Sequence, residues 1–362
     1  MNLLNLEPSR CVRVFSINSE CSKCSDICPT NAIALNDRLP SINQSLCVGC
    51  SGCVAVCPSE ALLHDDFTPT ESFFSYVQDE NLIFSCQKNI PCILALSVEH
   101  LISLAALKGT VVLDIGHCSS CEIGESVLNN VAKNLEFAHY ALEAIESDGV
   151  IKLEPLSIEG DESIKDRRDF FKTFHLQRVA KIKSDFDDSV TASIDEFVST
   201  DISQIDRASV RAKKITDRRK LFFTALKKIE KPSIYHVVDE KMVPFTSQKL
   251  LDEALCTACS ICYRVCPTAA LSSDSRNSKI DFDPFLCIKC HLCHDVCESN
   301  AITLSSSYNI KEWFEPTVQN LAAFRVRSCD ECGLIFSSVA GEKICRRCAL
   351  EEEEAMELWG LK

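Results

Sequence analysis

Glycine is scarce in this sequence, with only ten among 362 residues. None of the ten lies in a G-x-G-x-x-G or a G-x-x-x-x-G-K-[ST] pattern, the loops whose backbone amides cradle the phosphates of dinucleotides and nucleoside triphosphates. No Ser-His-Asp or paired-carboxylate arrangement stands out from the background either. These absences argue against a hydride-transferring or ATP-driven enzyme.

A long uninterrupted apolar run is also missing. The longest apolar region, residues 90–113, is broken by Glu99, His100 and Lys108, which rules against an ordinary membrane span. The first fifteen residues, MNLLNLEPSRCVRVF, have no basic start, no apolar core and no twin-arginine pair, so they do not predict a secretory signal. We therefore expect a cytoplasmic protein with reduced thiols.

The formal net charge is −14, from 52 acidic and 38 basic residues. It argues against nonspecific nucleic-acid binding and favours a basic protein partner. Residues 205–232 are an exception, with ten Lys or Arg against three Asp or Glu, and they form either a solvated helix face or a docking surface for an acidic redox partner. The phrases DRRDFFKTF (166–174) and DRRKLFFTALKKI (217–229) predict two amphipathic helices that hide Phe on one face.

Cysteine is the residue in excess, with 24 in the chain. Thiols in this number form either disulfides in an oxidising compartment or metal ligands in a reducing one, and their spacing separates the two cases. Many of these cysteines are separated by only two residues, which is a common spacing of metal ligands. The sequence therefore predicts metal sites.

A short motif recurs four times and closes a cysteine run each time. The four copies are CPTNAI (28–33), CPSEAL (57–62), CPTAAL (266–271) and CESNAI (297–302). Each copy leads into a short apolar strand, and the copies come in two pairs. The repetition predicts two related modules.

Three of the four runs have the complete spacing C-x2-C-x2-C-x3-C. They consist of Cys47, Cys50, Cys53 and Cys57; Cys256, Cys259, Cys262 and Cys266; and Cys287, Cys290, Cys293 and Cys297. Tight turns of two intervening residues let consecutive thiolates cover three irons of one cubane, and the turn amides can donate hydrogen bonds to sulfur. The runs resemble those of the bacterial two-cluster ferredoxin family, over residues 9–66 and 250–306.

This resemblance implies two [4Fe-4S] clusters in each module and a role in electron transfer. In that family the fourth cysteine of a run binds the other cluster of the module. The implied ligand sets are Cys28, Cys47, Cys50 and Cys53; Cys256, Cys259, Cys262 and Cys297; Cys266, Cys287, Cys290 and Cys293; and Cys21, Cys24 and Cys57 with one further ligand.

The first run lacks its first cysteine, because Asn18 stands in that position. Counting the cysteines of the other sites leaves Cys11 for this module. Cys11 precedes Cys21 by ten residues, and a chain of that length can span about 33 Å. We predict that Cys11 completes the site, with residues 12–20 folding back as a strand or loop. The alternatives are Asn18 or Glu20 as the ligand, or a three-iron cluster.

Four further cysteines lie between the modules. Residues 82–85 and 110–115 are predicted strands joined by a helix over 93–107, and a second helix (126–147) and strand (149–155) follow. Since a strand-helix-strand unit makes its strands parallel, their carboxyl ends meet at one edge. That edge carries Cys86, Cys92, Cys118 and Cys121. The arrangement resembles thioredoxin-like [2Fe-2S] domains, which implies a fifth iron-sulfur cluster. The alternative interpretations of these four cysteines are a zinc site, a redox-active dithiol and cysteines that only pack in the core.

The last quartet lies in CDECGLIFSSVAGEKICRRC, residues 329–348. Its cysteines are Cys329, Cys332, Cys345 and Cys348. Two C-x2-C knuckles separated by twelve residues resemble a zinc ribbon, which implies a closed, structural zinc site. Mononuclear iron is the alternative.

The sequence as a whole predicts an α+β fold. The expected units are module 1 (1–68), a βαβ four-cysteine domain (71–156), a charged helical insert (157–249), module 2 (250–308), a zinc-ribbon-like knuckle (322–350) and an acidic tail (351–362). We predict an electron-transfer protein without catalytic residues of its own, acting as a carrier or a wiring subunit of an anaerobic oxidoreductase. The alternatives are an accessory protein that binds a molybdenum oxidoreductase, such as formate dehydrogenase or nitrate reductase, and an enzyme whose active site is the central quartet, for instance a disulfide or sulfur reductase.

Overall fold

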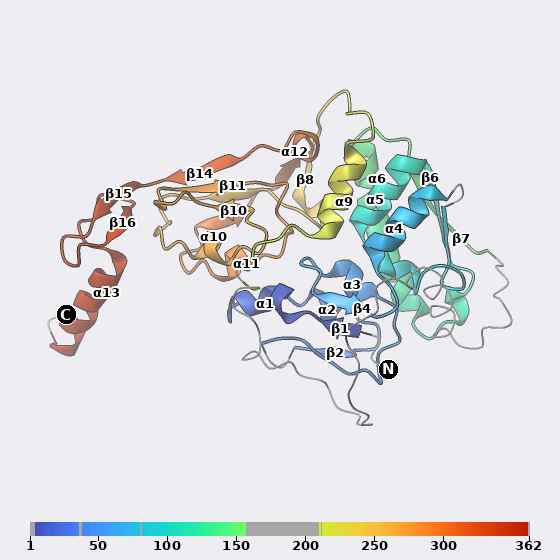
Figure 1. Cartoon of the computed structure of the whole chain (residues 1–362), viewed down its shortest axis with the longest axis horizontal. Helices are drawn as coiled ribbons and strands as arrows, with labels where there is room; N and C mark the ends of the chain where they lie inside the picture. Colours follow the sequence, from blue (N-terminus) through green and yellow to red (C-terminus); the bar gives the residue numbers. More distant parts are fainter. Residues whose placement is uncertain (1–3, 36–37, 80–81, 157–209, 211, 361–362) are drawn as a thin grey trace, which may run out of the picture.

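The computed structural model describes residues 4–35, 38–79, 82–156, 210 and 212–360. Short helices and small sheets alternate along the chain, in agreement with the predicted α+β class. Two cysteine-rich modules and a central domain lie against one another, and the C-terminal hairpin and helix project from the far end of module 2 (Figure 1). The predicted helix at 166–174 lies outside the described residues.

Module 1 consists of very short elements around its cysteine loops. They are β1 (Leu4–Leu6), η1 (Pro8–Arg10), α1 (Val12–Phe15), α2 (Lys23–Asp26), β2 (Ile33–Ala34), β3 (Ser41–Ile42), α3 (Gly52–Val56) and β4 (Leu62–His64). Strand β1 pairs antiparallel with β4, and β2 pairs antiparallel with β3. Segment 12–20 therefore starts with helix α1, and not with the predicted strand or loop.

Module 2 repeats this plan. Its elements are β9 (Lys249–Leu251), α10 (Ile261–Val265), β10 (Leu271–Ser272), β11 (Lys279–Phe282), α11 (Leu292–Asp295) and β12 (Ile302–Leu304). Strand β9 pairs antiparallel with β12, as β1 does with β4, and β10 pairs antiparallel with β11. One backbone hydrogen bond recurs at the same place in both modules: Glu7 donates to Ala61 and Asp252 donates to Ala301. The two modules are thus structural repeats.

The central domain is a three-stranded parallel sheet in the order β5-β6-β7, covered by helices. Its elements are α4 (Pro69–Gln78), β5 (Leu82–Phe84), η2 (Ile93–Ala95), α5 (Val98–Lys108), β6 (Thr110–Asp114), η3 (Cys118–Ser120), α6 (Gly124–Ala144) and β7 (Val150–Glu154). The parallel strands are confirmed. The predicted helix over 93–107 is interrupted after the short 3-10 helix η2. The Ser97 hydroxyl accepts the N–H of His100 at 3.2 Å, and α5 begins there.

Helix α9 (Asp217–Leu226) packs at the centre of the molecule. Phe222 is fully buried against Phe245 and Trp313, which confirms an amphipathic helix with a hidden Phe. However, Arg218 and Arg219 are also buried. The interpretation of this basic segment as a solvated helix face or a docking surface is therefore wrong for these two residues.

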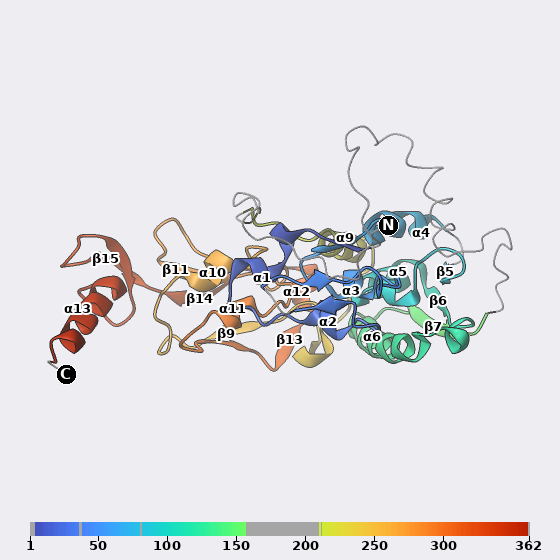
Figure 2. The same cartoon turned by 90° about the horizontal axis from the view of Figure 1, so that it is seen from below.

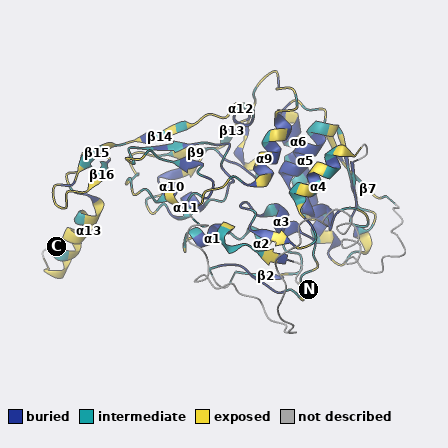
Figure 3. Cartoon of the chain, in the orientation of Figure 1, coloured by how far each residue is buried: buried dark blue, intermediate teal, exposed yellow. Residues whose placement is uncertain are grey.

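The remaining elements pack beside module 2 and the central domain or form the C-terminus. They are β8 (Val237–Asp239), η5 (Glu240–Met242), β13 (Ser307–Asn309), α12 (Lys311–Phe314), β14 (Gln319–Ala323), β15 (Arg325–Ser328), β16 (Ile335–Ser338) and α13 (Arg346–Leu358). Strand β14 extends the β10-β11 sheet, and β15 pairs antiparallel with β16. The sequence that we expected to form an acidic tail largely continues helix α13. Figure 3 shows this helix exposed, whereas α5 is largely buried. Figure 2 shows from below that strand β15 and helix α13 extend away from the rest of the molecule.

Candidate iron-sulfur and metal sites

The cysteine loops share an unusual backbone conformation. In each complete run, the residues on both sides of the second cysteine have positive φ; around Cys50 these are Gly49 (65°) and Ser51 (60°). The same pattern recurs around Cys259 and Cys290. Left-handed residues on both sides of a cysteine curl the chain, so the loop wraps around a common centre. No described residue between Glu20 and Ile27 has positive φ, so the incomplete run has a different loop.

Each closing cysteine also lies in a repeated turn. The third residue after it has positive φ: Asn31, Glu60, Ala269 and Asn300 follow the four closing cysteines. The turn directs a backbone amide at sulfur, since the N–H of Ala32 lies 3.3 Å from Sγ of Cys28 and that of Ala61 lies 3.2 Å from Sγ of Cys57. Amide donors of this kind stabilise the charge of a ligating thiolate.

The structure brings together the thiols of each predicted set. Cys28, Cys47, Cys50 and Cys53 line one small cavity, and Cys266, Cys287, Cys290 and Cys293 line another. Cys256 interacts electrostatically with Cys259 and Cys297, and Cys262 interacts with Cys256 and Cys259. In both modules the closing cysteine of one run therefore lies with the first three cysteines of the other.

The fourth set contains Cys11. This residue is 7% exposed and packs in one apolar cluster with Cys57. It also interacts electrostatically with Cys21. By contrast, Asn18 is exposed, and its N–H donates to the Ser16 hydroxyl at 3.1 Å. These positions favour Cys11 over Asn18 as the fourth ligand.

Comparison of the two modules shows where the incomplete run departs from the repeat. Cys11 follows the last residue of β1 by five positions, and Cys256 follows the last residue of β9 by the same number. After that point the chains differ: ten positions separate Cys11 from Cys21, whereas three separate Cys256 from Cys259. Helix α1 occupies the extra length. Cys11 therefore lies at the same distance in sequence from β1 as Cys256 does from β9, and the additional residues of module 1 lie between Cys11 and Cys21.

Burial has a clear effect on these thiols. It raises the pKa of Cys11 to about 12, that of Cys50 to about 11, and those of Cys262 and Cys293 to about 12. Such groups hold their protons near neutral pH unless a metal displaces them. The chemistry of the four sets fits iron-sulfur clusters, because their ligands are thiolates that a cluster keeps ionised.

The two sets of each module lie side by side, because their cysteines pack in one cluster. Within module 1, Cys53 interacts electrostatically with Cys24, which joins the two sets of that module. Within module 2, Cys262 interacts with Cys293. Between the modules, Lys23 interacts with Cys21 on one side and Cys290 on the other.

Direct hydrogen bonds hold the two modules together beside their cysteine loops. The Nζ of Lys23 donates to the carbonyl of Lys289 at 3.0 Å, and the N–H of Glu20 donates to Oδ2 of Asp295 at 3.1 Å. The set containing Cys21 and the set containing Cys290 therefore face each other across the contact between the modules.

The central quartet meets at the predicted edge of the parallel sheet. Cys86, Cys92, Cys118 and Cys121 line one small cavity together with Asp114 and His117. The quartet approaches module 1 through η2, because a Cβ added at Gly52 of α3 would lie only 2.7 Å from Cδ2 of Leu94. Only glycine permits this contact without a shift.

The C-terminal quartet is the tightest. The sulfurs of Cys329, Cys332, Cys345 and Cys348 all lie within 4.8 Å of one another. Cys329 follows strand β15, Cys332 lies in the β15–β16 turn, and Cys345 caps α13. Backbone amides, chiefly that of Cys332, lower the pKa of Cys329 to about 6. This set fits a tetrahedral metal ion.

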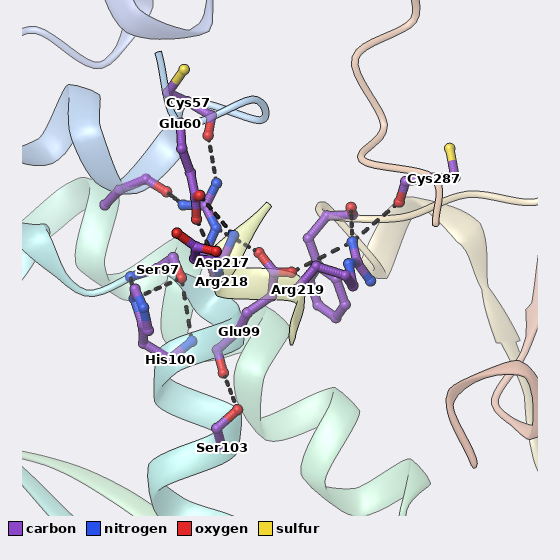
Figure 4. Close-up of polar contacts among 12 residues, drawn as sticks. Cys57, Glu60, Ser97, Glu99, His100, Ser103, Asp217, Arg218, Arg219 and Cys287 are labelled. Carbon is purple, nitrogen blue, oxygen red and sulfur yellow. Dashed lines mark hydrogen bonds and ion pairs between the residues drawn. The ribbon is translucent and has the colours of Figure 1, made fainter. Parts of the chain in front are cut away.

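A polar group that the sequence did not predict joins the three units (Figure 4). Glu99 of α5 accepts ion pairs from Arg218 at 3.0 Å and from Arg219 at 3.4 Å. Arg218 also donates to the carbonyls of Ala55 and Cys57 in module 1, and Arg219 donates to that of Cys287 in module 2 at 3.1 Å. The signal was a pair of arginines beside Phe222, in a segment whose other described charged residues are exposed.

Comparison with protein families supports an iron-sulfur protein. The model of the LdpA Fe-S cluster-binding domain matches residues 18–66, and the model of a 4Fe-4S dicluster domain matches residues 255–301. No curated protein matches the chain. Among the described helices, none is both long enough and apolar enough to cross a membrane. The matched ranges lie in modules 1 and 2, so the chain is an iron-sulfur protein with an Fe-S match in each module.

Proposed function

We propose that this chain is an electron-transfer protein that holds four [4Fe-4S] clusters, two in each module, in a row. The observation that carries this proposal is the position of Lys23, which lies between Cys21 and Cys24 of module 1. Its Nζ donates at 3.0 Å to the carbonyl of Lys289, the residue before Cys290 of module 2. A protein that only stored clusters would not need two modules joined at their cysteine loops. A row that crosses from one module to the other suits electron tunnelling.

The chain's own residues keep this row in place. When bound, each cluster would supply the ability to take up and release a single electron. Glu99, Arg218 and Arg219 fix the two modules on the central domain through buried bonds to backbone beside the cysteines. A rigid support of this kind keeps the distances between sites constant.

Two further metal groups belong to the proposal. The central quartet would hold a fifth iron-sulfur cluster, because its four thiols line one cavity and adjoin module 1. The C-terminal quartet would hold zinc, because two C-x2-C knuckles with Sγ atoms within 4.8 Å suit a closed tetrahedral site. The zinc would stabilise the β15–β16 hairpin and contribute most of its folding free energy.

In the cell, the protein would act as a free electron carrier or as the electron-transfer subunit of a larger oxidoreductase. An acidic chain of net charge −14 favours a redox partner with a basic docking surface. Such a partner could be a larger oxidoreductase, a molybdenum enzyme among them.

A reductive titration tests the proposal. Protein purified without oxygen is reduced stepwise, and the visible absorption and the EPR spectrum are recorded at each potential. We expect reversible reduction in several steps above about −700 mV, the lower end of the range of protein iron-sulfur clusters. Clusters that are present but cannot be reduced reversibly in this range would rule out electron transfer as the function.

A further inference from the structure

A cavity of about 390 Å³ lies where the two modules meet the central domain. Its walls come from α2 and α3 of module 1, from α5 and α6 of the central domain, and from α9. Sites for small molecules have this size and occur preferentially at such junctions. None of the cysteine sets lines it, so it is distinct from the proposed cluster sites.

Positive charge predominates in this junction cavity. Glu99 and Asp26 are its two carboxylates, and Glu99 already accepts ion pairs from both arginines. The four cationic lining residues are Lys23, Lys133, Arg218 and Arg219. Two cations more than carboxylates in a partly enclosed site attract an anion.

One face of helix α6 forms the polar side of the cavity. Asn130, Lys133, Asn134 and Phe137 all line it, and their spacing of three, four and seven residues places them on one helix face. Lys133 is exposed and forms no ion pair with any residue in the described part of the chain. The cluster-bearing modules do not use its charge, so it is available to a ligand.

The inner wall is apolar and contains a charge that is only partly compensated. Leu94, Val98 and Ile288 are buried there. Arg219 also lines this wall, and its Nε and Nη1 have no hydrogen-bond partner among the residues that the structure describes. The guanidinium stacks on the rings of Phe245 and Phe285 and pairs with Glu99, and its charge adds to the positive potential of the cavity.

We propose that the junction cavity binds one small organic anion, a molecule with an apolar body and a carboxylate, sulfonate or phosphate group. The apolar body lies on Leu94, Val98 and Phe137, and the anionic group lies toward Lys133. A purely structural role of the arginines explains their bonds to backbone. It does not explain Lys133 and Asn134 on the same face of α6.

The test uses 1-anilinonaphthalene-8-sulfonate as the probe, with anaerobic titration calorimetry of the cluster-loaded chain. N-phenyl-1-naphthylamine has the same apolar body without the sulfonate and serves as its neutral counterpart. We expect one sulfonate probe per chain and binding of the neutral compound that is weaker by about tenfold, the effect of one lost charge-assisted hydrogen bond. Equal affinity for both compounds would overturn the proposal.

Two matched pairs of variants locate the site. Lys133→Gln should weaken the sulfonate probe about fivefold, whereas Lys152→Gln, which removes an exposed lysine from β7, should not change its binding. Asn134→Trp should block the cavity, whereas Asn129→Trp, on the exposed side of the same helix, should leave binding intact. Because none of these side chains is buried, the variants should fold, which iron content verifies. Equal binding by Lys133→Gln and Lys152→Gln, or undiminished binding by Asn134→Trp, would refute the site.

Discussion

Glu99 and Arg218 form a buried ion pair in which Oε2 of the carboxylate lies 3.0 Å from Nε of the guanidinium. Both side chains are 6% exposed. Arg218 donates onward to the carbonyl of Cys57, so the pair connects helix α5 with a cysteine loop of module 1. The same carboxylate also pairs with Arg219, which reaches the carbonyl of Cys287 in module 2. One acidic residue therefore holds both modules on the central domain.

Replacing this carboxylate should destabilise the whole assembly. Glu99→Gln leaves two buried guanidinium groups without their counter-ion, and breaking a buried pair in this way costs about 3–5 kcal/mol. We expect a lower midpoint of chemical denaturation for the cluster-loaded protein. Glu125→Gln, which changes an exposed glutamate of α6, is the control and should leave the midpoint unchanged. An unaltered midpoint for Glu99→Gln would show that the pair does not hold the modules.

The assignment of Cys11 is tested by its replacement with serine. Cys11→Ser should reduce the iron content by one to four atoms per chain, about what conversion to a three-iron centre or loss of one [4Fe-4S] cluster would remove. Asn18→Ala is the matched variant and should leave the iron content and the EPR spectrum as in the wild type. If Asn18→Ala loses iron and Cys11→Ser does not, Asn18 is the ligand and Cys11 is a packing residue.

Much of the grouping of the cysteines could be predicted, because it depends on local spacing. The repeated runs predict which thiols gather, and the parallel strands β5 and β6 predict the edge where the central quartet meets. Helix α1 could not be predicted, since VRVF alternates apolar and polar residues and favours a strand. The break before Ser97 depends on a capping bond that competes with an apolar run. The pairing of Glu99 with α9 joins residues more than a hundred positions apart, so no local sequence pattern predicts it.

His100 gives the stability a pH dependence of known sign. Burial, and after it the charge of Arg218, lower the pKa of this histidine to about 3. Below about pH 6.5 the unfolded chain binds a proton that the native protein does not, so stability falls as the pH falls. Its contribution is complete above pH 6.5 and is lost progressively toward pH 3.

Comparison with His100→Gln isolates this effect. Between pH 6 and pH 5 the wild type should lose about 1.4 kcal/mol more stability than the variant, which corresponds to one proton over one pH unit. Denaturation followed by far-ultraviolet circular dichroism at each pH gives the two slopes. Parallel slopes would mean that His100 is already protonated in the native state.

A buried lysine should raise the reduction potential of one site in module 2. Lys249 is 1% exposed, its Nζ lies 2.8 Å from Nε2 of His294, and it interacts electrostatically with Cys293. Since reduction adds negative charge, a nearby cation favours the reduced form. Lys249→Gln should therefore lower the midpoint potential of one cluster. The shift should be on the order of 59 mV for each 1.4 kcal/mol by which the reduced cluster loses stabilisation.

Potentiometric EPR of both this variant and Lys241→Gln distinguishes a local effect from a general change in charge. Lys241 is exposed, so its replacement should leave all the potentials in place. Equal shifts in the two variants would contradict a specific role for Lys249.

The C-terminal quartet makes a separate prediction about metal content. Cys345→Ser removes one of the four thiols that lie within 4.8 Å of one another, so the chain should lose the zinc that we propose for this site and keep its iron. Elemental analysis of the wild type and the variant decides the matter. Iron lost in place of zinc would identify the site as mononuclear iron.

The most direct test of the central claim combines iron and sulfide analysis with EPR of the fully reduced protein. Four clusters in a row, with or without a fifth, predict about 16 to 20 irons per chain and broadened signals from neighbouring paramagnetic clusters. The broadening should extend to clusters of both modules, because Lys23 joins the set of Cys21 to that of Cys290. Fewer than about 12 irons in fully loaded protein, or four sharp signals without interaction, would contradict the row.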